Sequence, residues 1–140
     1  MCGIAGLIHR GNSTNVGGEM QSMLQSLKHR GPDSTGYALY GDNKSKNYIL
    51  RFKVGENVKE GSSAIMEDSS IYEKRKQQVN KEIISSGATI IEEKKVTPYC
   101  FRYLIECNDD LLEMAKKIES VEMTEILSLG KSLELVKDLG

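Results

Sequence analysis

The chain has 140 residues, which is enough for one domain with a single hydrophobic core. Hydrophobic residues make up 39% of the sequence and charged residues 28%, a balance typical of a soluble globular protein. The net charge is −1 and the basic residues are dispersed along the chain, so the composition gives no indication of nucleic-acid binding.

The N-terminal sequence Met1-Cys2-Gly3-Ile4 places a thiol at the second position. A small second residue permits removal of the initiator Met, after which Cys2 carries both a thiol and a free α-amine. The ordinary pKa values of these two groups are close enough for the amine to act as the base for its own thiol. The alternative interpretation is that Cys2 is a small apolar residue at the start of a strand, because free cysteines are usually buried and inert.

Residues Ile4–Ile8 form an apolar run that predicts a short buried strand with Cys2 at its start. This run is far too short for a signal peptide or a membrane span. A polar loop over Gly11–Gly18 is expected next. An amphipathic helix should follow it, because apolar residues then recur at helical spacing at Met20, Met23, Leu24 and Leu27.

Gly31 and Pro32 should end this helix, because glycine suits a helix C-cap and proline cannot continue the helix. They belong to the segment His29-Arg30-Gly31-Pro32-Asp33-Ser34-Thr35-Gly36, which precedes a predicted strand. Together with Met1-Cys2-Gly3-Ile4, this segment resembles the opening of the class II glutamine amidotransferases. These enzymes are N-terminal-nucleophile hydrolases and include the amidotransferase part of glutamate synthase.

Two strands, Gly36–Tyr40 and Asn47–Val54, are predicted to form a hairpin. One face of the second strand carries Tyr48, Leu50, Phe52 and Val54. A linker is expected over Gly55–Ser70, and then a charged helix over Ser69–Ser86 that ends at Gly87. The sparse apolar face of that helix consists of Ile71, Tyr72, Val79, Ile83 and Ile84.

The remaining chain predicts strands over Thr89–Val96 and Tyr99–Cys107, the second with Tyr99, Phe101, Tyr103 and Ile105 on one face. Asn108 or Asp109 can cap a following helix, whose apolar residues are Leu111, Leu112, Ala115 and Ile118. A strand over Val121–Leu129 and a helix from Lys131 complete the predicted elements.

These elements predict an α+β fold. The resemblance implies the αββα sandwich of N-terminal-nucleophile hydrolases, in which two sheets lie between helix layers. Residues 1–56 would contribute the nucleophile strand, helix and hairpin of the amidotransferase domain. Residues 57–140 would contribute the linker, a helix and a small inserted α+β unit, from about Gly87, that leads to the second half of the domain.

The resemblance stops halfway through the family domain. Family members bind the glutamine carboxylate through an Arg of a later Gly-His-Thr-Arg-like strand and form the oxyanion hole with a later Asn-Gly pair. Neither segment occurs in this sequence. The end of the chain, from Leu129, looks like the portion just before the glutamine-binding strand in stand-alone glutamate-synthase-like amidotransferase subunits. We therefore expect an incomplete αββα sandwich that contains the N-terminal half only.

The resemblance implies hydrolysis of the side-chain amide of L-glutamine, with Cys2 as the nucleophile and no cofactor or metal. Gly3 would let substrate approach the backbone closely. Supporting roles around the nucleophile would fall to Gly3, Arg30, Gly31, Asp33, Ser34 and Gly36. In the alternative interpretation, the glycines of the second motif only shape a turn and its charges are solvated.

The implied partner is a synthase subunit or domain that consumes the ammonia, with no nucleic acid and no membrane involved. Three cysteines without a Cys-x-x-Cys pair indicate reduced thiols and a cytoplasmic location, with Cys100 and Cys107 as packing residues. Two alternatives stay open: an N-terminal-nucleophile amidase with another substrate, and a non-catalytic subunit that retains the fold and binds the synthase.

Overall fold

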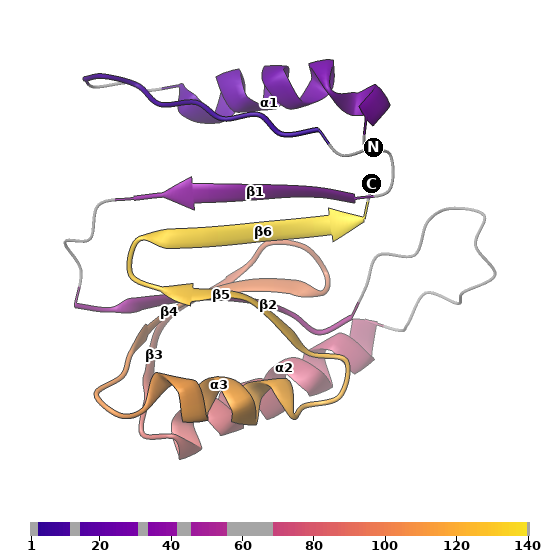
Figure 1. Ribbon diagram of the computed structural model, residues 1–140. Coiled ribbons are helices and arrows are strands. Elements are labelled where there is room, and N and C mark those ends of the chain that lie inside the picture. The colour runs from indigo at the N-terminus through magenta and orange to yellow at the C-terminus, as the bar shows by residue number, and fades with distance from the viewer. Residues whose placement is uncertain (1–2, 12–14, 31–33, 42–45, 56–68, 140) are drawn as a thin grey trace. The chain divides into compact units, whose positions relative to one another are not determined.

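The computed structural model describes residues 3–11, 15–30, 34–41, 46–55 and 69–139 (Figure 1). The chain divides into two compact units at the Thr35–Gly36 bond. We call residues 1–35 the N-terminal unit and residues 36–139 the C-terminal unit.

Three elements begin in the N-terminal unit: helix α1 (Val16–Ser26), the short 3-10 helix η1 (Lys28–Arg30) and strand β1 (Ser34–Tyr40), which continues into the C-terminal unit. The other elements belong to the C-terminal unit and are β2 (Tyr48–Lys53), α2 (Ser69–Ser85), β3 (Thr89–Lys95), β4 (Cys100–Glu106), α3 (Leu111–Glu119), β5 (Glu125–Gly130) and β6 (Leu133–Leu139). The described elements form an α+β arrangement with two sheets.

The larger sheet has the order β3-β4-β2-β5 and all its neighbours are antiparallel. Strand β2 lies inside it, with Leu50 opposite Tyr103 and Phe52 opposite Phe101 of β4. This strand precedes the predicted domain boundary at residue 56, yet both of its partners follow that boundary. The predicted inserted unit from Gly87 therefore shares its sheet with β2, and the observed division of the chain lies upstream.

One face of this sheet forms the core, as the alternating apolar residues of β2 and β4 predict. Leu50, Phe52, Phe101 and Tyr103 are buried. The ring of Phe52 stacks on Phe101 with centroids 5.4 Å apart and meets Tyr103 edge-on at 5.0 Å. Aromatic pairs in these geometries stabilise a core beyond the area that they bury.

Helices α2 and α3 pack against this sheet and against each other (Figure 1). The inward face of α2 consists of Tyr72, Arg75, Val79 and Ile83. The predicted face is therefore correct at three positions, whereas Ile84 is exposed and Ile71 is only half-buried. The buried Arg75 side chain donates a hydrogen bond to the carbonyl of Val54 at 3.1 Å, which satisfies one of its donors.

Helix α3 is capped by Asp110 and not by Asn108 or Asp109 as predicted. The Asp110 Oδ1 atom accepts a hydrogen bond from the Leu112 amide at 2.8 Å. The cap therefore lies one residue after Asp109, and the helix begins at Leu111. Met114 and Ile118 face the core, while Leu112 is 64% exposed. The predicted apolar face was therefore wrong at Leu112.

The smaller sheet pairs β1 with β6 and corrects two predictions. Strand β1 does not form a hairpin with β2, because the two strands lie in different sheets. The segment after Lys131 is a strand and not a helix, and Figure 1 shows it running opposite to β1. The amide of Gly41 donates to the Ser132 carbonyl at 2.7 Å, next to the turn between β5 and β6.

The predicted strand over Ile4–Ile8 is wrong. These residues are extended but belong to no strand, and Ile4 and Ile8 are 94% and 93% exposed. The predicted linker falls mostly on residues 56–68, and the predicted helix stop at Gly31 and Pro32 also lies outside the described residues. Within the described part, α1 ends at Ser26 and η1 follows it.

Candidate functional site

Three of the predicted site residues, Cys2, Gly31 and Asp33, lie outside the described residues. The structure describes the backbone of the other four: Gly3, Arg30, Ser34 and Gly36. Gly3 is the described residue that adjoins Cys2 in the sequence.

Gly3 lies against the segment that ends α1 and forms η1. A Cβ atom added to Gly3 would be 3.2 Å from the Cβ of Arg30 and 3.4 Å from the Cβ of Leu27. The first distance is tighter than ordinary van der Waals contact. The backbone at Gly3 can therefore lie this close to Arg30 only because Gly3 has no side chain. Within the N-terminal unit, the two sequence motifs are thus brought into contact at Gly3 and Arg30.

The segment after Gly3 runs alongside α1 in the N-terminal unit (Figure 1). Ala5 and Leu7 are half-buried, whereas Ile4 and Ile8, which flank them, are exposed. At the other end of the segment, the Nε2 atom of His9 lies 2.6 Å from the Oε2 atom of Glu19 in the first turn of α1. The segment is therefore held at Gly3 and at His9, near the end and the start of the helix.

Ser34 and Gly36 lie in β1. A Cβ atom added to Gly36 would be 3.5 Å from the carbonyl oxygen of Val136, an ordinary contact with the neighbouring strand β6. In the C-terminal unit, the role of Gly36 that the structure supports is therefore strand packing.

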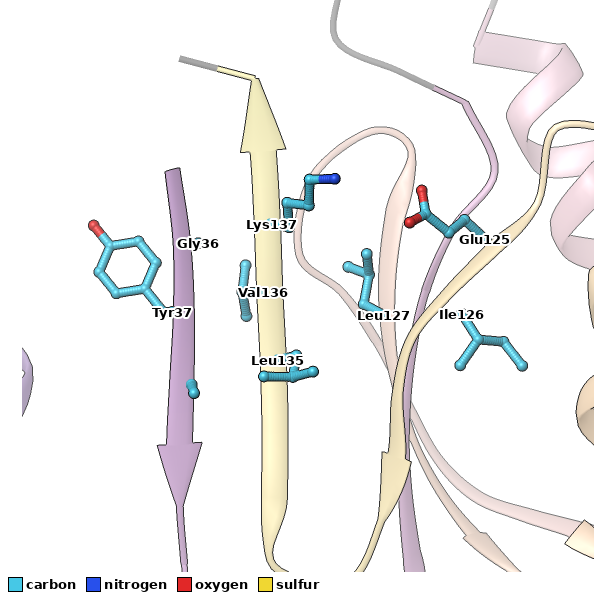
Figure 2. Close-up of a pocket in the computed structure, with 9 residues that line it drawn as sticks. Gly36, Tyr37, Glu125, Ile126, Leu127, Leu135, Val136 and Lys137 are labelled. Carbon is cyan, nitrogen blue, oxygen red and sulfur yellow. The ribbon is translucent and has the colours of Figure 1, made fainter. Parts of the chain in front are cut away.

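An open, mostly apolar pocket of about 360 Å³ lies among β1, β5 and β6 (Figure 2). It is lined by Gly36, Tyr37, Ala38, Glu125, Ile126, Leu127, Leu135, Val136 and Lys137. These residues include no cysteine, serine or histidine, so they favour binding of apolar groups over nucleophilic catalysis. The sequence did not predict this pocket, because β6 forms one of its walls where a helix was expected.

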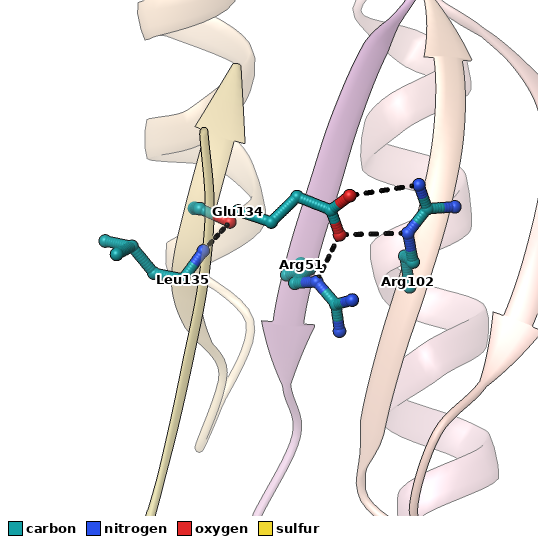
Figure 3. A network of polar contacts seen from close by, with 5 residues as sticks. Arg51, Arg102, Glu134 and Leu135 are labelled. Carbon is teal, nitrogen blue, oxygen red and sulfur yellow. Dashed lines mark hydrogen bonds and ion pairs between the residues drawn. The ribbon is translucent and has the colours of Figure 1, made fainter. Parts of the chain in front are cut away.

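A cluster of three charged residues connects β6 to the larger sheet (Figure 3). Glu134 accepts hydrogen bonds from Arg51 Nε at 2.6 Å and from Arg102 Nε and Nη2 at 3.0 and 3.2 Å. Burial alone would raise the pKa of Glu134, but the hydrogen bonds from Arg102 and Arg51 outweigh burial, so its pKa lies below the ordinary value. The hydrogen bond to Glu134 raises the pKa of Arg102.

A separate hydrogen bond holds the neighbouring residue of β6, because the Leu135 amide donates to the Ser128 hydroxyl at 3.0 Å. The three charged residues of the cluster all have partners within the protein, which makes this a structural cluster.

In the part of the chain that the structure describes, no three His, Cys, Asp or Glu residues come together as a metal site would require. No described helix combines the length and the apolar character needed to cross a membrane.

The chain is similar over its whole length to a protein of Methanothermobacter thermautotrophicus named "Putative glutamine amidotransferase". The two are 32% identical over 146 aligned residues. The alignment covers 100% of this chain and 44% of the relative, so the chain spans less than half the length of that protein. No family model matches the sequence. No solved structure matches it either.

Proposed function

We propose that this chain is the nucleophile-bearing part of a class II, glutamate-synthase-like glutamine amidotransferase. It would hydrolyse the side-chain amide of L-glutamine through Cys2 and deliver the ammonia to a synthase subunit or domain. The glutamine amidotransferase name of the relative supports the general class, and the two N-terminal motifs support the type.

The observation that carries this proposal is the close approach of Gly3 to Arg30. Gly3 and Arg30 are 27 positions apart in the chain, yet the Cβ atom of Arg30 would lie 3.2 Å from a Cβ atom on Gly3. A nucleophile at the N-terminus needs neighbouring residues to fix its position, because the end of a chain is otherwise poorly ordered. The contact places residues of the second motif beside the residue that follows Cys2.

In the proposed reaction, the Cys2 α-amine takes the thiol proton and the thiolate attacks the carboxamide carbon of glutamine. The carbon–nitrogen bond breaks, the amine returns the proton to the leaving ammonia, and a thioester remains on Cys2. A water molecule then attacks the thioester, which releases glutamate and restores the thiol. The atoms that this chain contributes are those of Cys2 and the residues that position it.

The two sheets of the described structure support the proposed αββα arrangement, since a sandwich of this class requires two sheets. Helices α2 and α3 would form one outer layer. The carboxylate-binding and oxyanion-hole segments of the family would come from the part of the complete protein that corresponds to the remaining length of the relative.

The proposal is tested on the natively expressed, complete polypeptide. Intact-mass measurement should give a mass without Met1, because the free α-amine is the base. A diazo-ketone analogue of glutamine should then modify Cys2 and abolish glutaminase activity. Cys2→Ala should remove both the labelling and the activity.

Cys100→Ala and Cys107→Ala are the matched controls, and both should retain labelling and turnover. A retained Met1 without labelling would contradict the proposal and favour the non-catalytic subunit. Labelling of Cys2 by an acylating reagent without any turnover of glutamine would instead favour an amidase with another substrate.

A further inference from the structure

We propose that His9 and Glu19 form a positioning pair, which holds residues 3–8 along α1 and thereby orients Cys2. This inference rests on the proposed function of Cys2. It concerns residues outside both sequence motifs, to which neither the motifs nor the comparisons assign a role.

Within the described part of the chain, residues 3–10 have few polar restraints. Among the described residues, residues 3–10 make one hydrogen bond. It joins His9 Nε2 to Glu19 Oε2 at 2.6 Å. The apolar contacts are partial, because Ile4 and Ile8 are almost fully exposed. A segment with few buried contacts and few hydrogen bonds is ordered only where specific contacts hold it.

The two contacts of this segment lie at opposite ends of α1. Gly3 packs where α1 ends and η1 begins, and His9 binds where α1 starts. The segment therefore runs antiparallel to the helix and is held at both ends. Loss of the His9 contact would leave the close approach at Gly3 as the remaining restraint among these two on residues 3–8.

The described residues of the N-terminal unit carry few negative charges. Glu19 is the one acidic residue among them, whereas the basic residues besides His9 are Arg10, Lys28, His29 and Arg30. Another described carboxylate is therefore not available to His9 within the unit. Glu19 also lies in the first turn of α1, where the helix dipole stabilises a negative charge.

The test measures how fast the diazo-ketone analogue modifies Cys2 in the complete polypeptide, as a function of its concentration. His9→Ala and Glu19→Ala should each lower the limiting rate about two- to fivefold, the range expected for an exposed pair. The concentration that gives half the limiting rate should stay unchanged, because the pair does not touch the glutamine analogue. The double variant should be no slower than either single variant.

Two further variants separate positioning from general destabilisation. Glu19→Gln keeps a hydrogen-bond acceptor for His9 and should restore most of the rate. Glu73→Ala is the control, because it removes a similarly exposed pair with Lys95 (2.9 Å) in the C-terminal unit. It should leave the rate of Cys2 modification unchanged.

Backbone NMR relaxation of Ala5, Gly6 and Leu7 gives an independent readout. His9→Ala and Glu19→Ala should both increase the fast motion of these amides. Unchanged relaxation, or additive rate losses in the double variant, would show that the pair does not hold the segment. Relaxation changes in a protein whose unaltered Cys2 is never labelled would instead contradict the proposed function and leave the contact itself established.

Discussion

Arg51 and Arg102 lie directly opposite each other on β2 and β4, and both donate hydrogen bonds to the carboxylate of Glu134 in β6. Like charges in directly opposite positions destabilise a sheet. The carboxylate therefore compensates the repulsion within one sheet and connects it to a strand of the other sheet.

Replacement of this carboxylate is expected to destabilise the C-terminal unit. Glu134→Gln leaves two partly buried guanidinium groups without a negative partner, which should lower the free energy of unfolding by about 1–3 kcal/mol. Urea unfolding measures the change. The matched control is Glu125→Gln, which breaks the more exposed pair with Lys53 and should cost less than about 1 kcal/mol. Equal costs for the two variants would contradict the structural role of Glu134.

The same carboxylate predicts a dependence of stability on pH. The pKa of Glu134 is lowered in the folded state from its ordinary value of 4.5. Its contribution is therefore complete above the ordinary value and is lost as the pH falls through the lowered one. The difference in unfolding free energy between the unaltered protein and Glu134→Gln should shrink steadily below about pH 4.5. A difference that does not change with pH anywhere on the acid side of the ordinary value would contradict this titration.

The aromatic cluster of the larger sheet should dominate the stability of the core. Phe52 is fully buried against Phe101 and Tyr103, so Phe52→Ala should lower the free energy of unfolding by about 3–5 kcal/mol. Ile84→Ala removes an exposed side chain from α2 and serves as the control, with an expected change within about 0.5 kcal/mol. Thermal or urea unfolding that ranks the two variants equally would mean that β2 is not central to the core.

Two glycines should respond to alanine in opposite directions. Gly87 has φ +76°, and an added Cβ would clash with the Asp109 carboxylate, so Gly87→Ala should cost more than about 1 kcal/mol. Gly17 lies in α1, and an added Cβ would meet nothing within 4 Å. Because alanine is the better helix former, Gly17→Ala should increase helix content or leave it unchanged, as measured by circular dichroism.

The larger sheet could be predicted from the sequence because its strands have one buried face. The alternation of Tyr99, Phe101, Tyr103 and Ile105 predicts the inward face of β4, and all four are buried. The same pattern predicts the inward face of β2. Such a pattern depends on local spacing alone and is therefore visible in a single sequence.

Strand β6 could not be predicted in this way. Glu134 is a polar residue at a position that faces the larger sheet, and its partners Arg51 and Arg102 lie 83 and 32 residues away. Local spacing contains no information about such partners. The hairpin prediction for β1 was wrong for a related reason, since a turn sequence indicates that the chain bends but not which strand it then joins.

The roles of the candidate site residues stay predictions. Gly3 lies close to Arg30, but this contact assigns no role to either residue, and Cys2, Gly31 and Asp33 lie outside the described residues. The contact between His9 and Glu19 had no sequence signal, because neither residue belongs to a motif and a separation of 10 positions has no characteristic spacing.

The order of the strands has a consequence for how the protein is made. Strands β3 and β4 are neighbours in sequence and can pair as soon as both have left the ribosome. Strand β2 must wait for β4 and then for β5, and β1 must wait for β6, which ends at Leu139. The sheets therefore close from the middle of the chain outward.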